Sequence, residues 1–456
     1  MDRSIYLVQP SYRDRSGTLL KGRRQGLHSA VLPALSAAVP PDWRKRSCIE
    51  YFEDVDFDCD ASVVGITSMG YDFPRGRELA AEFRRRGKVV LFGGWPAGLS
   101  PEKLSGLCDA LVTGNPGPEA LGGILADAER GRLAPEYRCD VEIDYPWDYS
   151  VFDGKRIDYP PVVTGVGCPN RCAFCCIAAT YRGRYTPRAI DCVVADVRSA
   201  AARSRTVSFV DSNLYGDRAY LLRLCEAMSA EAVCARWGAQ ATIAVGADEA
   251  ALRALRAAGC RMLFIGMETL DQANLRSVGK PYAVADYRDR VARIQDAGIA
   301  VAGYFILGLD GDDPGTFDRL YDFVRGTGIN LPILNVLLPA SGTALHERLR
   351  KEGRLLIEDE DEMLANNAGY NSSARRCFFV PKGMTPRQVE EGYLALSLRL
   401  TTPWLTLRRS LHRDPVIAAA LLAMNLDLRR KTALQARADR EEQAALTARS
   451  TPSSVN

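Results

Sequence analysis

The sequence contains only three histidines and lacks any long apolar run. His28, His346 and His412 lie far apart in the chain of 456 residues, which excludes a histidine-rich metal site. No stretch approaches the ~18 apolar residues that a membrane-spanning helix needs. The first residues also lack the apolar stretch of a signal peptide. We therefore expect a cytoplasmic protein.

A surplus of charge of one sign is also missing. The 59 basic and 56 acidic side chains leave a net charge of +3, which is small for this length. Such a balance gives no argument for a nucleic-acid partner or a membrane-surface partner. With 47% apolar and 25% charged residues, the composition is that of an ordinary soluble protein.

The 13 cysteines do not form a disulfide framework. Their number is odd and most of them are scattered along the chain, so we expect them to be reduced and mostly buried. The exception is a close-set group formed by Cys168, Cys172 and Cys175. No second group of this kind follows in the sequence.

This cysteine group directly follows an apolar run at 162–167, which predicts a buried strand. Thiolates are soft ligands that suit an iron–sulfur cluster or zinc. Three ligands would leave one iron of a four-iron cubane open for a non-protein ligand. The alternative is a structural zinc site, which needs a fourth protein ligand; Cys176 and Cys192 are available.

Short apolar strands alternate with helices in the first 135 residues, which predicts a Rossmann-like, doubly wound parallel sheet. Ligands of such sheets bind at the carboxyl ends of the strands. Expected strands are 4–8, 48–52, 62–68, 88–92 and 109–113, and expected helices are 25–39, 74–86, 101–107 and 119–130. The overall fold class is therefore α/β.

The rest of the chain divides into three parts. An aromatic, irregular segment at 136–160 predicts a linker, and strands and helices alternate again over 161–355. A mostly helical region with a disordered tail follows at 356–456, and its polar stretch 366–371 either reaches the substrate pocket or forms a surface loop. The expected strands of the middle part are 162–167, 206–211, 236–245, 261–267, 299–307 and 332–338.

The cysteine loop and four later phrases resemble the radical S-adenosylmethionine (radical SAM) superfamily. The loop reads Cys168-Pro-Asn-Arg-Cys172-Ala-Phe-Cys175, and the phrases follow the second, fourth, fifth and sixth strands. The resemblance implies a partial (β/α)6 barrel, a [4Fe–4S] cluster on the three cysteines and S-adenosylmethionine on the open iron. It also implies a 5′-deoxyadenosyl radical, a small-molecule substrate and an external electron donor of the flavodoxin, ferredoxin or reductase type.

The same resemblance suggests the remaining site residues. The expected cofactor contacts are Phe174, Asn213, Gln240, Glu268, Gly308 and Leu338, and the expected catalytic residues are Asp211, Tyr215 and Asp217. The role predicted for Gln240 rests on strand alternation, which points its side chain into the barrel lumen. The alternatives are structural: a turn capped by its own Asx side chains, and a salt bridge for Glu268.

The first 135 residues resemble the cobalamin-binding domain that precedes many radical SAM barrels, through the phrases at 64–68 and 92–94. The Asp-x-His-x-x-Gly motif of a lower-axial histidine is absent, and Trp95 and Pro96 crowd the expected site. Cobalamin binding is therefore left open.

The architecture looks like that of natural-product tailoring enzymes. The favoured interpretation is radical dehydration of an aminoglycoside sugar, such as paromamine at its 3′ position, with Tyr215 or Asp217 protonating the leaving hydroxyl. A cobalamin-dependent radical SAM methyltransferase is the alternative among enzymes. A non-catalytic metal-binding module is the alternative from another class.

Overall fold

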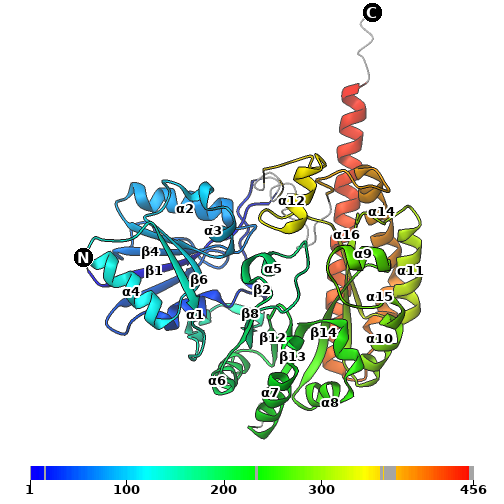
Figure 1. The fold of residues 1–456 in the computed structure, drawn as a ribbon, viewed down its shortest axis with the longest axis horizontal. Coiled ribbons are helices and arrows are strands. Elements are labelled where there is room, and N and C mark those ends of the chain that lie inside the picture. Colours follow the sequence, from blue (N-terminus) through cyan, green and yellow to red (C-terminus); the bar gives the residue numbers. More distant parts are fainter. Residues whose placement is uncertain (1, 15–16, 232–234, 360–362, 364–375, 451–456) are drawn as a thin grey trace, which may run out of the picture.

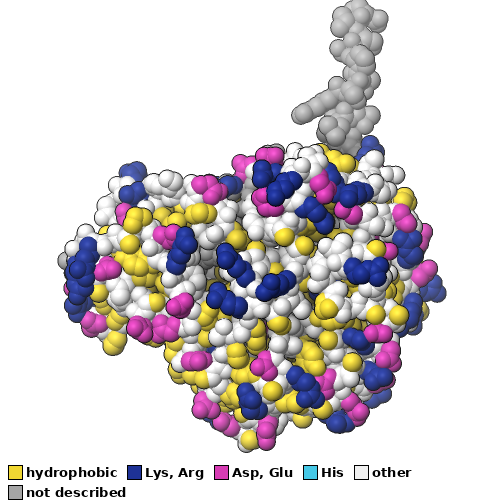
Figure 2. Space-filling model, in the orientation of Figure 1, with side chains coloured by type: hydrophobic (Ala, Val, Ile, Leu, Met, Phe, Trp, Pro, Cys, Tyr) yellow, Lys and Arg dark blue, Asp and Glu magenta, His cyan; other side chains and the backbone are white. Residues whose placement is uncertain are grey.

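The computed structural model describes residues 2–14, 17–231, 235–359, 363 and 376–450. Figure 1 shows an N-terminal lobe beside a larger lobe, with the short helix α5 (Cys176–Tyr181) between them. The predicted stretch 366–371 and the tail from 451 onward lie outside the described residues. On the face in Figure 2, basic side chains are interspersed with acidic ones, in keeping with the small net charge.

A parallel sheet of six strands forms the N-terminal lobe, in the order β3-β1-β4-β5-β6-β7. Its first five strands have the flavodoxin-like order, in which ligands bind at the carboxyl ends near the switch point. The bounds are β1 (Ser4–Gln9), β3 (Arg44–Ile49), β4 (Val63–Thr67), β5 (Val89–Gly93), β6 (Ala110–Asn115) and β7 (Glu136–Val141).

Helices cover both faces of this sheet because its strands are apolar on both sides. Ile5 and Leu7 of β1 pack into one core, while Tyr6 and Val8 pack into the other. Successive strand residues point to opposite faces, so one short strand serves both cores. The covering elements are α1 (Val31–Ala38), α2 (Phe73–Arg85), α3 (Trp95–Leu99), α4 (Pro118–Glu129) and the 3₁₀ turn Pro101–Leu104.

The doubly wound fold is confirmed, but two predicted helices differ from the structure. The segment predicted as a helix at 25–39 begins as strand β2 (Arg24–Leu27), which pairs with the distant β8 (Arg156–Tyr159). The helix predicted at 101–107 is only a 3₁₀ turn, and α3 precedes it. β7 lies within the segment predicted as a linker and extends the sheet instead.

The second lobe is a partial barrel of six parallel strands, in the order β16-β15-β14-β13-β12-β9. The strands are β9 (Pro161–Val162), β12 (Thr206–Phe209), β13 (Arg236–Ala241), β14 (Cys260–Glu268), β15 (Ala300–Leu307) and β16 (Leu331–Val336). The predicted strand 162–167 is split, because β10 (Gly165–Gly167) leaves the barrel and pairs with β11 (Tyr185–Pro187). The strand predicted at 236–245 ends at Ala241.

Alternation along the barrel strands separates an outer face from a lumen. Trp237, Ala239 and Ala241 of β13 are buried, whereas Gln240 between them is exposed. The outer face packs against helices and the 3₁₀ turn Ile243–Ala247. These helices are α6 (Ile190–Ala201), α7 (Arg218–Ala230), α8 (Glu249–Ala257), α9 (Gln272–Ser277), α10 (Tyr287–Asp296) and α11 (Thr316–Thr327).

The C-terminal region is helical, as predicted. Ile417 and Leu421 of α16 pack against Met262 and Leu331 on the inner side of the barrel. The helices are α12 (Ala344–Lys351), α14 (Pro386–Leu400), α15 (Pro403–Ser410) and α16 (Pro415–Ser450). Helices over the edge strand β16 shield it from pairing with other chains.

Among the described residues, no helix has the length and apolar character that crossing a bilayer requires. The division at 135, 160 and 355 stays a prediction.

Candidate active site at the mouth of the barrel

The three cysteines lie on the loop between β10 and α5, and neighbouring segments hold this loop in place. The Cys168 N–H donates to the Arg184 carbonyl at 3.0 Å. The Ala173 N–H donates to the Val278 carbonyl at 3.1 Å, and the Ala173 carbonyl accepts from the Leu345 N–H at 2.8 Å. The loop is therefore fastened to β11, to the segment after α9 and to the start of α12.

Burial governs the chemistry of these thiols. It raises the pKa of Cys168, and it raises the pKa of Cys172 to about 11, with further contributions from Cys175 and Cys168. All three thiols lie on this one short loop, where Cys172 is buried and Cys168 and Cys175 are partly exposed. Since metals bind thiolates, loading the site must release protons. The three cysteines fit a [4Fe–4S] cluster in number, chemistry and proximity.

Within the described ranges, no three His, Cys, Asp or Glu side chains converge as ligands of a single metal ion. Cys176 begins α5 and is partly exposed, and Cys192 lies on α6. A cubane cluster binds its thiolates on separate irons, so its ligands stand further apart than those of one ion.

Glu268 ends β14 in an unusual conformation. Its φ is +64°, a left-handed value that residues other than glycine seldom adopt, and the pairing with β15 shifts register between Gly266 and Glu268. Its carboxylate accepts an ion-pair hydrogen bond from Lys280 at 2.8 Å, and both side chains are buried. The salt bridge weighed as an alternative for Glu268 is therefore present, with Lys280 as the partner.

Asp211 and Asn213 follow β12 and are buried at 1% and 3% exposure. The Oδ1 of Asp211 accepts from the Thr164 N–H, the Thr164 hydroxyl and the Gly165 N–H, at 2.8–2.9 Å. The Oδ2 of Asp211 and the Oδ1 of Asn213 have no hydrogen-bond partner among the described residues. Buried polar atoms are rarely left unpartnered, so these two oxygens are available to a ligand beside the cysteine loop.

The other two residues predicted as catalytic make structural contacts. The Asp217 carboxylate caps α7 by accepting from the Tyr220 N–H at 3.0 Å. The Tyr215 hydroxyl donates to Asp248 at 2.9 Å, and Arg218 also binds this carboxylate. Capping by Asx side chains, the alternative weighed for this turn, thus accounts for Asp217.

The remaining predicted contacts surround the lumen. Gln240 is exposed on the inner face of β13, and Phe174 packs at the edge of the main core. Gly308 follows β15 with φ +94°, and its N–H donates to buried Asp312 at 2.8 Å. Leu338 is half-buried in the turn after β16. The roles of these four residues in binding a cofactor stay predictions.

Tyr304 is a lumen residue that the sequence analysis did not assign. It lies on β15 beside Gly266, and its ring is 6.3 Å from that of Phe264. Burial and the nearby charge of Glu268 raise the pKa of its hydroxyl. The sequence carries no such signal, because residues 304–307 are all apolar or aromatic and only their burial separates Tyr304 from the fully buried Phe305.

The carboxyl edge of the N-terminal sheet meets the cysteine loop. The Tyr181 hydroxyl of α5 donates to the Oδ1 of Asn115, the last residue of β6, at 2.8 Å. Leu99 of α3 packs against Gly342 after β16, where an added Cβ would lie 2.9 Å from it. The edge expected to hold a cofactor therefore faces the mouth of the barrel.

Trp95 lies at this edge of the sheet and is hydrogen-bonded to it. The indole N–H donates to the Met69 carbonyl at 2.9 Å. At Gly94, with φ +107°, an added Cβ would lie 1.9 Å from the Ser68 carbonyl. The glycine pair thus packs against the protein's own backbone. Met69 is 43% exposed, so this edge of the sheet is open beside Met69 and covered over the glycines.

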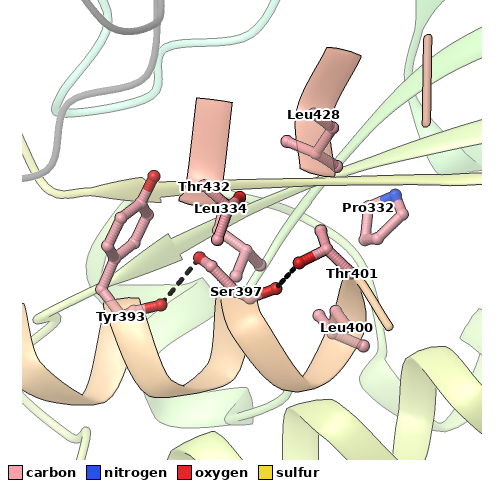
Figure 3. Close-up of a pocket in the computed structure, with 8 residues that line it drawn as sticks. All are labelled: Pro332, Leu334, Tyr393, Ser397, Leu400, Thr401, Leu428 and Thr432. Atoms are coloured by element: carbon pink, nitrogen blue, oxygen red, sulfur yellow. Dashed lines mark hydrogen bonds between the residues drawn. The ribbon is translucent and has the colours of Figure 1, made fainter. Parts of the chain in front are cut away.

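A cavity elsewhere does not belong to this site. Figure 3 shows it between β16, α14 and α16, on the outer face of the barrel. Its volume of about 20 Å³ admits about one water. The Ser397 and Thr401 hydroxyls donate to carbonyls of their own helix, so we interpret it as a packing gap.

Asp211 gives a testable pH dependence. Burial raises its pKa from 3.8 to about 6, so the folded state binds the proton more tightly and the free energy of unfolding falls as the pH rises from 4 to 6. At 1.36 kcal/mol per unit, ionisation costs about 3 kcal/mol. Asp211→Asn keeps an Oδ1 acceptor and should remove this loss, so the variant should be the more stable protein at pH 7.

The measurement is denaturant unfolding of both proteins at pH 4, 5, 6 and 7. The difference between them isolates Asp211, since other titrating carboxyls are common to both. A difference that stays flat over this range would contradict the assignment. A parallel loss of S-adenosylmethionine affinity in Asp211→Asn would show that Oδ2 binds the ligand.

Comparison with known proteins agrees with the geometry. Residues 162–324 match the family described as the radical SAM superfamily, so the chain contains a radical SAM domain. This domain implies a [4Fe–4S] cluster and S-adenosylmethionine. Bacteriochlorophyllide d C-12(1)-methyltransferase from Chlorobaculum tepidum is 27% identical over 307 residues, which are 64% of this chain and 66% of that protein.

Two groups of solved structures share the fold over nearly the whole chain. The radical S-adenosylmethionine methyltransferase TsrM from Kitasatospora setae has a TM-score of 0.69 at 16% identity, covering 97% of this chain and 100% of that one. The cobalamin-dependent S-adenosylmethionine radical enzyme OxsB has a TM-score of 0.67 at 11% identity, covering 95% and 72%. At these identities the likeness concerns the fold alone.

Proposed function

Because residues 162–324 form a radical SAM domain, we propose that this chain is a radical SAM methyltransferase that uses cobalamin. The observation that carries the proposal is the contact between the two lobes, where Tyr181 beside the cysteine loop binds Asn115 at the carboxyl edge of the N-terminal sheet. A cofactor on this edge would lie next to the cluster. The methyltransferase names of the similar proteins support the same reading.

Each part of the site has a task in this proposal. When bound, the cluster and S-adenosylmethionine supply the radical, and cobalamin supplies the transferred methyl group. Cys168, Cys172 and Cys175 would hold the cluster. The unpartnered oxygens of Asp211 and Asn213 would accept hydrogen bonds from the methionine ammonium. Their burial keeps water from competing for these bonds.

The lumen suggests the substrate class. Its side chains include Gln240, Phe264, Tyr304 and Asn335, which are uncharged polar or aromatic groups. The buried carboxylate at its edge, Glu268, is neutralised by Lys280. We infer a small, uncharged substrate with a flat or apolar part, since aromatic faces favour such groups.

Deoxygenation of an aminoglycoside sugar is the competing outcome of the same assay. An aminoglycoside carries several ammonium groups, which carboxylates would pair. In the described part of the site, Asp217 caps a helix and Asp248 is bound by Arg218. Tyr215, expected to protonate the leaving hydroxyl, donates to that same Asp248. These contacts favour methyl transfer.

The test is anaerobic purification, reconstitution with iron, sulfide and hydroxocobalamin, and reductive cleavage of S-adenosylmethionine. We expect about one cobalamin per chain, seen by its visible absorption, and formation of 5′-deoxyadenosine. With S-adenosylmethionine carrying a deuterated methyl group, the product of a bound substrate should gain that methyl group. Cys172→Ala serves as the control that should keep cobalamin and lose cleavage.

Two results would contradict the proposal. Failure to retain cobalamin, with 5′-deoxyadenosine still formed, would remove methyl transfer through cobalamin. Loss of water from a hydroxylated sugar without methylation would establish dehydration instead.

A further inference from the structure

A buried ion pair lies directly behind the cysteine loop. Lys280 and Glu268 are 8% and 7% exposed, and the Nζ of Lys280 is 2.8 Å from the Oε1 of Glu268. The segment that carries Lys280 supports the loop, because the Ala173 N–H donates to the Val278 carbonyl at 3.1 Å. The positive charge is thereby fixed beside the iron ligands.

The ion pair occupies space that is left open because residue 266 is a glycine. A Cβ added to Gly266 would lie 2.5 Å from the Oε1 of Glu268 and 3.1 Å from the Nζ of Lys280. The left-handed backbone at Glu268 turns its carboxylate toward Lys280. Strain of this kind persists only where the surroundings enforce it, and here it places a buried charge pair.

Backbone packing holds this cation beside the cysteine loop. A Cβ added to Gly279 would lie 3.2 Å from the Arg171 carbonyl. Gly279 directly precedes Lys280, and Arg171 directly precedes Cys172, so the segment that carries the cation packs against the segment that carries this ligand.

We propose that Lys280 raises the reduction potential of the cluster held by Cys168, Cys172 and Cys175, and that Glu268 limits this effect. Reduction adds one electron to the cluster and breaks no protein bond. A fixed cation in a buried, low-dielectric place stabilises the added negative charge. This role goes beyond the proposed methyl transfer, because it requires only the cluster.

The test is that replacing Lys280 and replacing Glu268 should shift the reduction potential of the cluster in opposite directions. The reconstituted protein is titrated without S-adenosylmethionine, and the reduced cluster is counted by EPR at each potential. Lys280→Met should lower the ratio of reduced to oxidised cluster about tenfold at a fixed potential, a shift of about 59 mV. The variant removes the fixed cation that stabilises the electron added to the cluster.

Glu268→Gln should raise the same ratio, because the cation loses its counter-charge. Lys280→Arg keeps the charge and should stay within about twofold of the unchanged protein. Shifts of equal sign in Lys280→Met and Glu268→Gln, or no shift in either, would overturn the proposal and leave the pair a purely structural role.

Iron and sulfide are counted in every variant before titration. If Lys280→Met does not hold a cluster, Glu268→Gln decides alone: a raised potential supports the proposal, and an unchanged or lowered one overturns it. Failure of methyl transfer would not affect this result, because neither cobalamin nor substrate takes part in the titration.

Discussion

Cys172→Ala should reduce S-adenosylmethionine cleavage by about a thousandfold or more, as expected when a group that the chemistry depends on is removed. Cys172 is the most buried of the three thiols, and its loop is fastened on several sides. A solvent ligand at this position would lack the thiolate that holds one iron. The iron content and the visible absorption of the cluster should fall together with the activity.

Cys176→Ala is the matched control. Cys176 is four residues further along the same loop and begins α5, so its removal changes a thiol without touching the three predicted ligands. The variant should keep the iron content and most of the cleavage activity. Retained iron in Cys172→Ala together with lost iron in Cys176→Ala would show that the ligand set is assigned wrongly.

The position of the cysteine loop was predictable from the sequence because its signal is local. Spacing and a preceding apolar run place Cys168, Cys172 and Cys175 after a strand, and the structure has that order, with β10 directly before the loop. The partial barrel likewise follows from strands and helices that repeat along the chain. Both depend on neighbours within a few residues.

Contacts between distant segments were not predictable in this way. β2 lies in a stretch that was expected to be helical, yet it pairs with β8 some 130 residues later. The apolar pattern around His28 fits a helix, but this histidine packs against Phe52 and Phe152, and burial lowers its pKa to about 4. Tertiary pairing overrides local preference here.

The same limit applies inside the site. Asp211, Tyr215 and Asp217 lie in one short turn, and the sequence analysis predicts all three as catalytic residues. The structure separates them, since Asp217 caps α7, Tyr215 binds Asp248, and only Asp211 keeps an unpartnered oxygen beside the loop. Which of several polar side chains is already satisfied depends on partners that the sequence does not identify.

The second large effect concerns stability. Arg188 is 1% exposed, and its guanidinium donates to Asp196 at 2.8 Å and to the carbonyls of Ile143, Tyr145 and Val163 at 2.7–2.9 Å. It thereby fastens the segment at 143–147 to α6 and to the start of the barrel.

Arg188→Met should lower the free energy of unfolding by about 3–5 kcal/mol, because it leaves Asp196 as a buried charge without its partner. Arg188→Lys should recover little, since an ammonium cannot reproduce the planar fork that reaches four acceptors. The control is Arg198→Met, which removes a largely exposed pair with Glu231 and should cost less than about 1 kcal/mol.

Denaturant unfolding, followed by far-ultraviolet circular dichroism, measures all three variants. Adding Asp196→Asn to Arg188→Met should restore part of the loss, because the unpaired charge disappears while the missing hydrogen bonds remain. No gain in the double variant would mean that the four bonds of Arg188, rather than the buried charge, dominate. Equal losses in Arg188→Met and Arg198→Met would contradict the account, since burial is what distinguishes the two pairs.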